Sequence, residues 1–418
     1  MKQFFFFLFF FWQSMHGCAL SFADEKWSSE LHGYLKTEYK QAWEEDIPLL
    51  LREQMWAEYL FTTGKYRFFF SGHLDTDLSA ILRNTEEERA DLVLHEAYVT
   101  DDLTNLDIIA GLQQIRWGTA DSLSTVDIIN PIDYRNPVAT ARSTNRLSVP
   151  AIDFNFSIKG DMLDIILVPW PRFSKLPAAG SPWEPEFLEK LRKMDEEGSL
   201  TLRDRNNEET PEWGLNYRLF RHRFDIGVLF YDGYEHFPLF SMSTTSTTKP
   251  PVVNMIHERY QTCSVDLAFA LDDGTLRAES TLKINYPFQS DNLEIVQNDY
   301  MQWLFGWEQT FDINVRIDGQ IFYYKRLTSD IISGVERETW GVTASIENKF
   351  LDDALTSGFR GVWYTTEDSF MIEQFNTYDY NDHWKISFGL LYLNGNSDGP
   401  VSGLEDNSNI YLEVKYNF

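Results

Sequence analysis

Acidic, basic and amide side chains are concentrated in one stretch of the chain, residues 111–137, which reads GLQQIRWGTADSLSTVDIINPIDYRNP. Period-two alternation puts Leu112, Gln114 and Arg116 on one face of a strand, which we expect to be the inner face of a closed sheet. After Gly118 the chain becomes rich in Asp, Asn and Pro, which favour turns. The stretch therefore predicts a strand that continues into a polar loop.

Arginines and aspartates of this loop have the geometry to form charge-assisted hydrogen bonds that hold the loop folded inward as a constriction. The residues that we expect at the constriction are Gln114, Arg116, Asp121, Asp127, Asp133 and Arg135, with Arg142 and Arg146 as further partners. Two alternatives stay open. In one the aspartates hold Ca²⁺, although their spacing of six is unlike a packed calcium loop; in the other the stretch is an ordinary surface loop.

Strands flank this loop along most of the chain, and several separate an apolar face from a charged one. In residues 275–288 the apolar face carries Leu276, Ala278, Ser280, Leu282, Ile284, Tyr286 and Phe288. The charges that we expect to face the interior are Arg218, Arg277, Glu279, Lys283, Arg316 and Asp318. They either pair across neighbouring strands and solvate the wall, or form a basic ladder for anionic solutes.

Eighteen such period-two segments can be counted between residues 29 and 418, with sixteen as the alternative because segments 90–101 and 369–380 are the weakest. Short connections follow the even-numbered segments and long ones mostly follow the odd-numbered segments, as in transmembrane barrels. Eighteen strands in one closed sheet enclose more space than side chains fill, so the interior must be wet and the apolar face must meet lipid. The sequence predicts an all-β, antiparallel transmembrane β-barrel.

Both chain ends agree with a barrel. Residues 1–23 form an expected signal peptide, with one Lys, a short apolar run and cleavage before Asp24, and residues 24–418 form the barrel. Residues 409–418 alternate strictly and finish on Phe418, which is typical of the closing strand of outer-membrane barrels. One long connection, residues 172–210, is expected to contain a short helix with Phe187, Leu188, Leu191 and Met194 on one side.

Composition excludes several other classes of protein. The formal net charge is −28, from 64 acidic and 36 basic residues, so nucleic acid is not expected as a partner. Cys263 is the only cysteine after the expected signal peptide, so the sequence excludes an internal disulfide and a cysteine-based metal or haem site. We expect no cofactor, no metal and no catalytic residues, and the sequence leaves the oligomeric state open.

The patterns QQxxWGxADxL and NPxDxR within residues 111–137 resemble a large family of uncharacterised outer-membrane porin-like proteins related to alginate-export-type barrels. The resemblance implies a channel in the outer membrane of Gram-negative bacteria that passes small hydrophilic solutes, with anionic solutes as one option. Its partners would be the lipid bilayer, the outer-membrane assembly machinery and the solutes. A structural or conduit component of the outer membrane is the alternative, and a barrel-rim hydrolase is a further one.

Overall fold

The computed structural model describes residues 27–43, 45–85, 89–120, 122–135, 137, 145–204, 210–243, 250–311, 314–395 and 399–418. The expected signal peptide, residues 1–23, lies outside this part of the chain and stays a prediction. No helix among the described residues is both long and apolar enough to cross a membrane.

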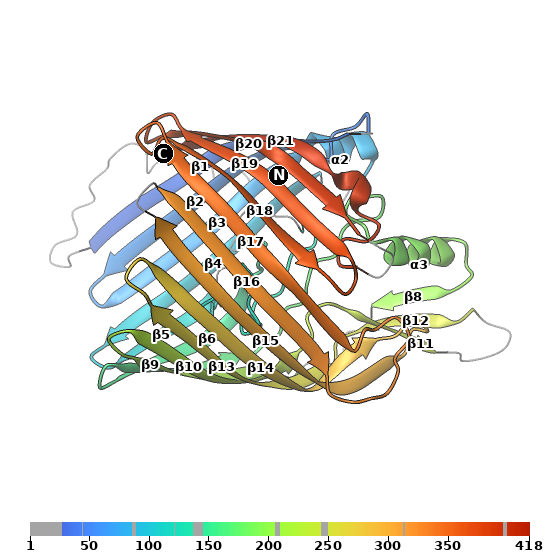
Figure 1. Cartoon of the computed structure of the whole chain (residues 1–418), viewed down its shortest axis with the longest axis horizontal. Coiled ribbons are helices and arrows are strands. Elements are labelled where there is room, and N and C mark those ends of the chain that lie inside the picture. The colour runs from blue at the N-terminus through green and yellow to red at the C-terminus, as the bar shows by residue number, and fades with distance from the viewer. Residues whose placement is uncertain are drawn as a thin grey trace.

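Eighteen strands form one antiparallel sheet that closes into a barrel (Figure 1), which confirms the predicted architecture and strand number. The first nine are β1 (Trp27–Ala42), β2 (Leu50–Thr63), β3 (Tyr66–Asp77), β4 (Ala90–Leu103), β5 (Leu106–Gln113), β6 (Val149–Ile158), β7 (Asp161–Val168), β9 (Glu212–Phe220) and β10 (Phe224–Tyr234). The other nine are β13 (Arg259–Ala270), β14 (Gly274–Gln289), β15 (Ile295–Phe311), β16 (Val315–Arg326), β17 (Glu338–Phe350), β18 (Leu355–Tyr364), β19 (Ser369–Asp379), β20 (Trp384–Asn394) and β21 (Asn409–Asn417).

The barrel closes between its first and last strands. β1 pairs with β21 from Tyr34 opposite Asn417 to Ala42 opposite Asn409. Beyond the last strand residue, Gly33 and Phe418 exchange two backbone hydrogen bonds of 3.2 and 3.0 Å. No strand edge of this sheet is therefore left unpaired at the seam, which is the condition for crossing a bilayer with strands.

The long connections gather at one end of the barrel, on the right in Figure 1. They carry α2 (Leu78–Arg83), α3 (Glu186–Glu196), the 3₁₀ turn η3 (Glu405–Asn407) and a small sheet of β8 (Thr201–Asp204), β11 (Leu239–Ser243) and β12 (Val252–Ile256). The helix expected in the long connection is α3, which buries Leu188 and Leu191 against the small sheet. Phe187 and Met194, expected on the same side of this helix, are less buried, with 44% and 42% of their surface exposed.

Two expected strands are shorter than their sequence pattern. The strand expected at residues 252–271 is divided into β12, which leaves the barrel, and β13. The strand expected at residues 106–119 ends at Gln113. Its inner face also differs from the expectation: the register sets Gln113 opposite Val149 and Leu112 opposite Pro150. Because Val149 packs in the lumen, Gln113 and not Leu112 is on the inner face.

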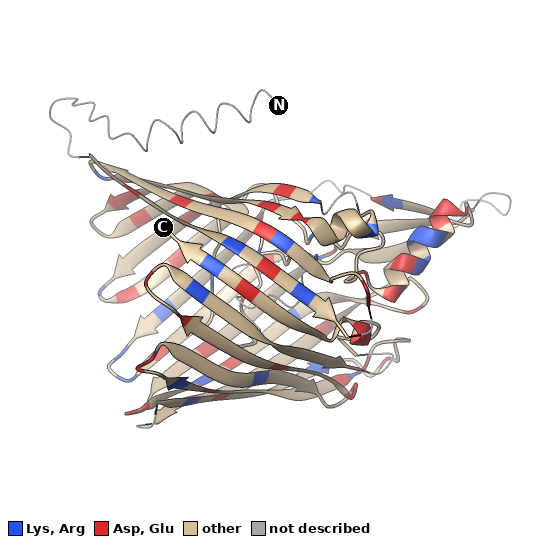
Figure 2. Cartoon of the chain, turned by 90° about the horizontal axis from the view of Figure 1, so that it is seen from above, with Lys and Arg blue, Asp and Glu red and all other residues tan. Residues whose placement is uncertain are grey.

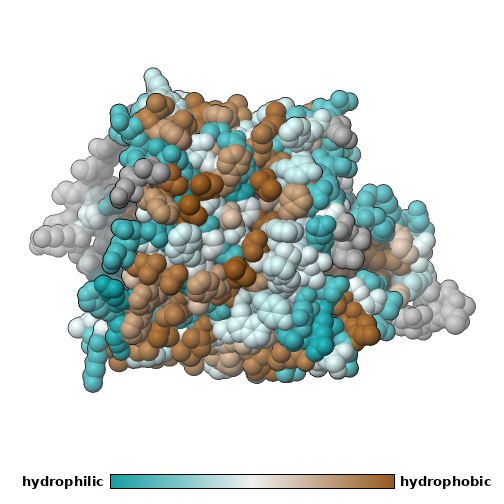
Figure 3. Space-filling model, viewed as in Figure 1, coloured by the Kyte–Doolittle hydropathy of each residue, from teal (hydrophilic) through white to brown (hydrophobic). Residues whose placement is uncertain are grey.

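The outer surface is apolar around the middle of the barrel. Large apolar side chains on it are exposed, including Trp303, Phe305, Ile321, Trp340 and Trp363 at 38–57%. Figure 3 shows brown apolar residues over the barrel strands, with teal polar residues concentrated toward the barrel ends. A water-soluble barrel would bury these side chains, so the exposed belt is the surface that faces lipid.

One β-bulge changes which face of β14 is apolar. Lys283 pairs with Tyr300 and Tyr286 pairs with Asn298, so β14 contains one residue more than β15 between these two pairs. Asn285 takes up the extra residue with φ 54°, and its N–H donates to Asp299 Oδ1 at 3.0 Å. The bulge inverts the alternation beyond it. Tyr286 and Phe288, expected on the lipid face, therefore point into the lumen, and Phe288 is only 9% exposed.

The seam gives a test of closure, because a Cβ at Gly33 would lie 2.5 Å from both the Phe418 ring and the Trp56 carbonyl oxygen. We expect Gly33→Val to lower the free energy of unfolding by about 1–3 kcal/mol, the usual cost of overpacking. The measurement is the fraction of protein that migrates as the folded band on unboiled gels. Ser29→Val, at an exposed position of the same strand, is the control. Equal folded fractions in the two variants would contradict this account of the seam.

Candidate pore constriction

Residues 114–148 connect β5 to β6, and we call this connection the inward segment because its described residues lie inside the barrel. Its described residues are 114–120, 122–135, 137 and 145–148. It enters the lumen where β5 ends. The Gln114 N–H donates to Glu96 Oε1 at 3.0 Å, and the Gln114 side-chain amide donates to the Arg146 carbonyl at 2.7 Å.

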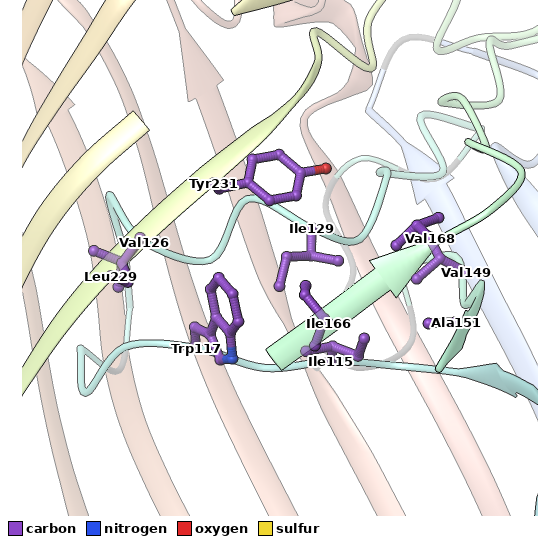
Figure 4. Packing of buried hydrophobic residues seen from close by; sticks show 10 residues of the cluster. All are labelled: Ile115, Trp117, Val126, Ile129, Val149, Ala151, Ile166, Val168, Leu229 and Tyr231. Carbon is purple, nitrogen blue, oxygen red and sulfur yellow. The ribbon is translucent and has the colours of Figure 1, made fainter. Parts of the chain in front are cut away.

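An apolar cluster fastens the inward segment to one side of the lumen (Figure 4). Ile115, Trp117, Val126 and Ile129 of the segment pack against side chains from the inner faces of β6, β7 and β10. These wall residues are Val149, Ala151, Ile166, Val168, Leu229 and Tyr231. Large side chains buried in this way contribute about 1.5–3 kcal/mol each.

A glycine in the wall makes room for the largest of these side chains. A Cβ at Gly214 of β9 would lie 2.7 Å from the Trp117 ring. The absence of a side chain at Gly214 therefore lets the Trp117 ring pack closely against this wall.

Polar contacts hold the far end of the segment on β14. The Glu279 carboxylate accepts from the Ala120 N–H at 3.2 Å, from the Thr125 N–H at 2.6 Å and from the Ser124 hydroxyl at 3.0 Å. The Thr125 and Thr281 hydroxyls are 2.9 Å apart. Glu279 is only 2% exposed, so its charge is stabilised mainly by these donors.

Contacts on β16 extend the attachment. The Ser122 hydroxyl donates to Asp318 Oδ1 at 3.2 Å, and the Leu123 N–H donates to Gln320 Oε1 at 2.9 Å. The segment is thus covalently joined to β5 and β6 and hydrogen-bonded to β14 and β16. In the order of strands around the barrel, the contacts of its described residues run from β4 to β16, and none reaches the strands from β17 through β21 to β3.

An asparagine that we did not expect at the site joins the two arms of the segment. Asn130 is 2% exposed; its Oδ1 accepts from the Ile115 N–H at 2.8 Å and its Nδ2 donates to the Leu147 carbonyl at 2.9 Å. A buried amide that satisfies two backbone groups at once fixes their separation. The NPxDxR pattern was the signal for it, because Asn130 is the first residue of that pattern.

Arg116 does not hold the inward segment, in contrast to the expectation from the sequence. Its side chain is exposed, and it has no hydrogen bond or ion pair within the part of the chain that the structure describes. The physical reason is the alternation of Ile115 and Trp117 on its two sides, which turn toward the wall and leave Arg116 on the lumen side. Asp121 and Arg142 lie outside the described residues.

Among the described residues, the remaining expected charges form ion pairs at two places in the segment. Asp127 lies 3.3 Å from Arg146, and Asp133 lies 2.6 Å from Arg135. Arg135 also reaches Asp91 of β4 at 2.8 Å, which ties this part of the segment to the wall.

Most of the expected lumen charges are paired across strands, and Figure 2 shows the acidic and basic positions along neighbouring strands. Arg218 binds Asp266 at 2.9 Å. Arg277 and Arg316 both bind Glu308, at 2.8 and 2.9 Å. Sequence reasoning missed Asp266 and Glu308 as partners, because strand register and not position in the sequence sets them opposite these arginines.

The attachment to β14 predicts that Glu279→Gln will loosen the inward segment, because a neutral amide accepts more weakly than a carboxylate. Val126→Cys supplies a probe, with the exposed Cys263 changed to Ser. Val126 belongs to the segment and is fully buried in the apolar cluster between the segment and the wall. We expect Glu279→Gln to speed labelling of this thiol at least about tenfold, the effect of losing about 1.4 kcal/mol.

Arg116→Gln is the matched control and should leave labelling slow. If Arg116→Gln accelerated labelling and Glu279→Gln did not, the attachment would be wrong.

Comparisons with known proteins agree with this architecture. A search of curated proteins found no match. The structure is similar to that of OccAB3 of Acinetobacter baumannii, with a TM-score of 0.53 and 12% identity over 95% of this chain and 100% of that chain. It is also similar to OccD3 (OpdP) of Pseudomonas aeruginosa, with a TM-score of 0.53 and 7% identity over 94% of this chain and 91% of that chain. At these identities the likeness shows the fold, an outer-membrane-type β-barrel.

A family model matches residues 82–418, more than half of the chain. The family is uncharacterised, as expected from the sequence, while the relation to alginate-export-type barrels and the significance of the two sequence patterns stay predictions. The chain belongs to the family described as "Protein of unknown function (DUF1302)".

Proposed function

We propose that this protein is an outer-membrane channel that passes small hydrophilic solutes and prefers anions. The observation that carries the proposal is a closed barrel of eighteen strands whose inner face is charged and accessible to water. On the wall that the inward segment leaves uncovered, the side chain of Arg360 keeps 37% of its surface exposed, and that of Arg316 beside the segment keeps 42%. Such exposure inside a closed sheet fits a lumen that holds water.

The inward segment would set the narrowest part of this path. It occupies one side of the lumen and presents the exposed side chain of Arg116 to the space that remains. Its apolar cluster and its contacts to Glu279 would keep the constriction at a fixed position, which a selective channel needs. In this proposal the constriction residues Gln114, Asp127, Asp133 and Arg135 hold the segment in place, and Arg116 faces the solute.

The preference for anions is supported by a row of three lysines. Lys415 of β21 lies directly opposite Lys36 of β1 and Lys385 of β20. Like charges opposite each other repel, so this row costs stability. Lys36 is compensated by Glu38 at 3.2 Å and Lys385 by Asp379 at 3.1 Å.

Lys415 has no ion pair within the described residues, and its ammonium lies 3.9 Å from the centre of the Tyr34 ring. An anion that passes this wall would relieve the repulsion, which is how a ring of cations selects for anions. Export with the expected signal peptide and insertion by the assembly machinery complete the proposal, which assigns no catalytic role.

Selectivity measured in planar bilayers tests the proposal. The purified protein should conduct, and Lys415→Met should move the reversal potential in a salt gradient toward cations, because it removes a lumen cation that has no paired carboxylate. The control is the double variant Arg360→Gln with Glu373→Gln. It removes one charge of each sign from a pair joined at 2.6 Å and should leave the reversal potential unchanged.

Absence of conductance in protein that shows the folded band on unboiled gels would overturn the channel. Conductance with the same reversal potential in Lys415→Met would overturn the preference for anions at this wall.

A further inference from the structure

A continuous group of aromatic rings lines the lumen near the end that carries the long connections, and we call it the inner aromatic belt. Its members are Tyr260, Tyr286, Phe288, Tyr300, Phe322, Tyr324 and Tyr364. Neighbouring ring centres are 5.1–6.2 Å apart, within the range of favourable aromatic contacts. Phe288 and Phe322 are buried in the belt, whereas Tyr286, Tyr300, Tyr324 and Tyr364 keep part of their surface exposed to the lumen.

Two local features admit three of these rings to the lumen. The bulge at Asn285 turns Tyr286 and Phe288 from the lipid side to the lumen. Gly341 of β17 makes room for Phe322, since a Cβ there would lie 2.4 Å from that ring. Apolar rings would be stable in the lipid belt without either feature, so stability alone does not account for their position.

One cation lies among the rings. The Lys283 ammonium is 4.5 Å from the centre of the Tyr286 ring and 5.5 Å from that of Tyr260. Within the described residues it has no ion pair, unlike Arg277 on the same face of β14, which binds Glu308. The carboxylate of Glu235 interacts with this charge only from beyond 4.0 Å, and it accepts from the Phe237 N–H.

An ammonium held among aromatic rings loses hydration, and cation–π contacts of roughly 0.5–2 kcal/mol replace only part of it. A bound anion would supply the remaining stabilisation of the Lys283 charge. The rings beside it offer a flat apolar surface that small inorganic anions cannot use, but that a planar ring can.

We propose that Lys283 and the inner aromatic belt form a binding site for an anion that carries an aromatic ring. The proposal rests on the proposed channel function and names the class of solute for it. Along β14 the belt lies on the long-connection side of Glu279, where the inward segment is attached. A solute that enters from that end meets the belt before it meets the constriction.

Benzenesulfonate and methanesulfonate separate the contribution of the ring from that of the charge, because both are fully ionised at neutral pH. Benzyl alcohol supplies the ring without the charge. Binding to the purified barrel in detergent is measured by titration calorimetry, which requires no open channel. We expect benzenesulfonate to bind at least about fivefold more tightly than methanesulfonate, the size of one favourable aromatic contact, and more tightly than benzyl alcohol.

Two variants locate the site. Lys283→Met keeps the packing of the side chain and should abolish the advantage of benzenesulfonate over benzyl alcohol. Tyr286→Leu should abolish its advantage over methanesulfonate. Lys349→Met, which removes an exposed lysine from β17 at the opposite end of the barrel, is the matched control and should bind all three probes like the parent.

Equal affinities for the two sulfonates, or unchanged binding in both Lys283→Met and Tyr286→Leu, would overturn the site. The outcome is separable from that for the channel. In planar bilayers, conductance without a benzenesulfonate block that depends on Lys283 would reject this site and keep the channel. Calorimetric binding with no conductance would keep the site and reject the channel.

Discussion

The interior of this barrel depends on how one buried carboxylate is satisfied. Glu279 accepts from two backbone N–H groups and from hydroxyls of the inward segment. Without the segment, β14 would face the lumen with an acid that only water solvates. Without Glu279, the Ala120 and Thr125 N–H groups would lose their acceptor. Each therefore stabilises the other, and the apolar cluster around Trp117 adds an attachment that does not depend on charge.

Pairing of charges sets the electrostatic character of the lumen. Asp266, Glu308 and Glu347 pair with Arg218, Arg277 and Arg316 respectively. Each carboxylate offsets most of the positive potential of its arginine. Counting inward lysines and arginines therefore overstates the positive potential. The cations that matter are those whose surroundings are aromatic or open, namely Lys283, Lys415 and Arg116. Two of them contact tyrosine rings, which stabilise a cation without neutralising it.

Aromatic residues lie both on the lipid-facing surface and in the lumen. On the outer surface, Trp303, Trp340 and Trp363 are exposed to lipid, where an indole is stable. Aromatic residues also line part of the lumen, and a bulge in β14 and Gly341 of β17 admit three of them, Tyr286, Phe288 and Phe322. Breaking the alternation of β14 at Asn285 is thus the device that gives one strand a charged inner face at Glu279 and an aromatic one at Phe288.

The sequence by itself determined the barrel and the end at which the long connections lie, because alternation and turn residues are local and recur along the chain. It favoured eighteen strands over sixteen, and strand pairing in the structure decided for eighteen. It also indicated that residues 111–137 depart from the strand pattern. It did not determine where β5 ends, since Gln114 and Arg116 continue the polar and apolar alternation after the strand has stopped. Nor did it reveal the bulge at Asn285, because one extra residue is defined only against the partner strand.

Only the tertiary structure decided which residues hold the inward segment. Glu279 and Ala120 are 159 positions apart, and no local pattern relates them. They meet because closure brings β14 to the side of the lumen that β5 and β6 lead into. Arg116 was the plausible anchor by charge alone, yet the apolar side chains on either side of it are buried against the wall and leave it in the lumen. Periodicity gives the face of a strand, whereas the partner of a side chain on that face depends on the register of strands distant in sequence.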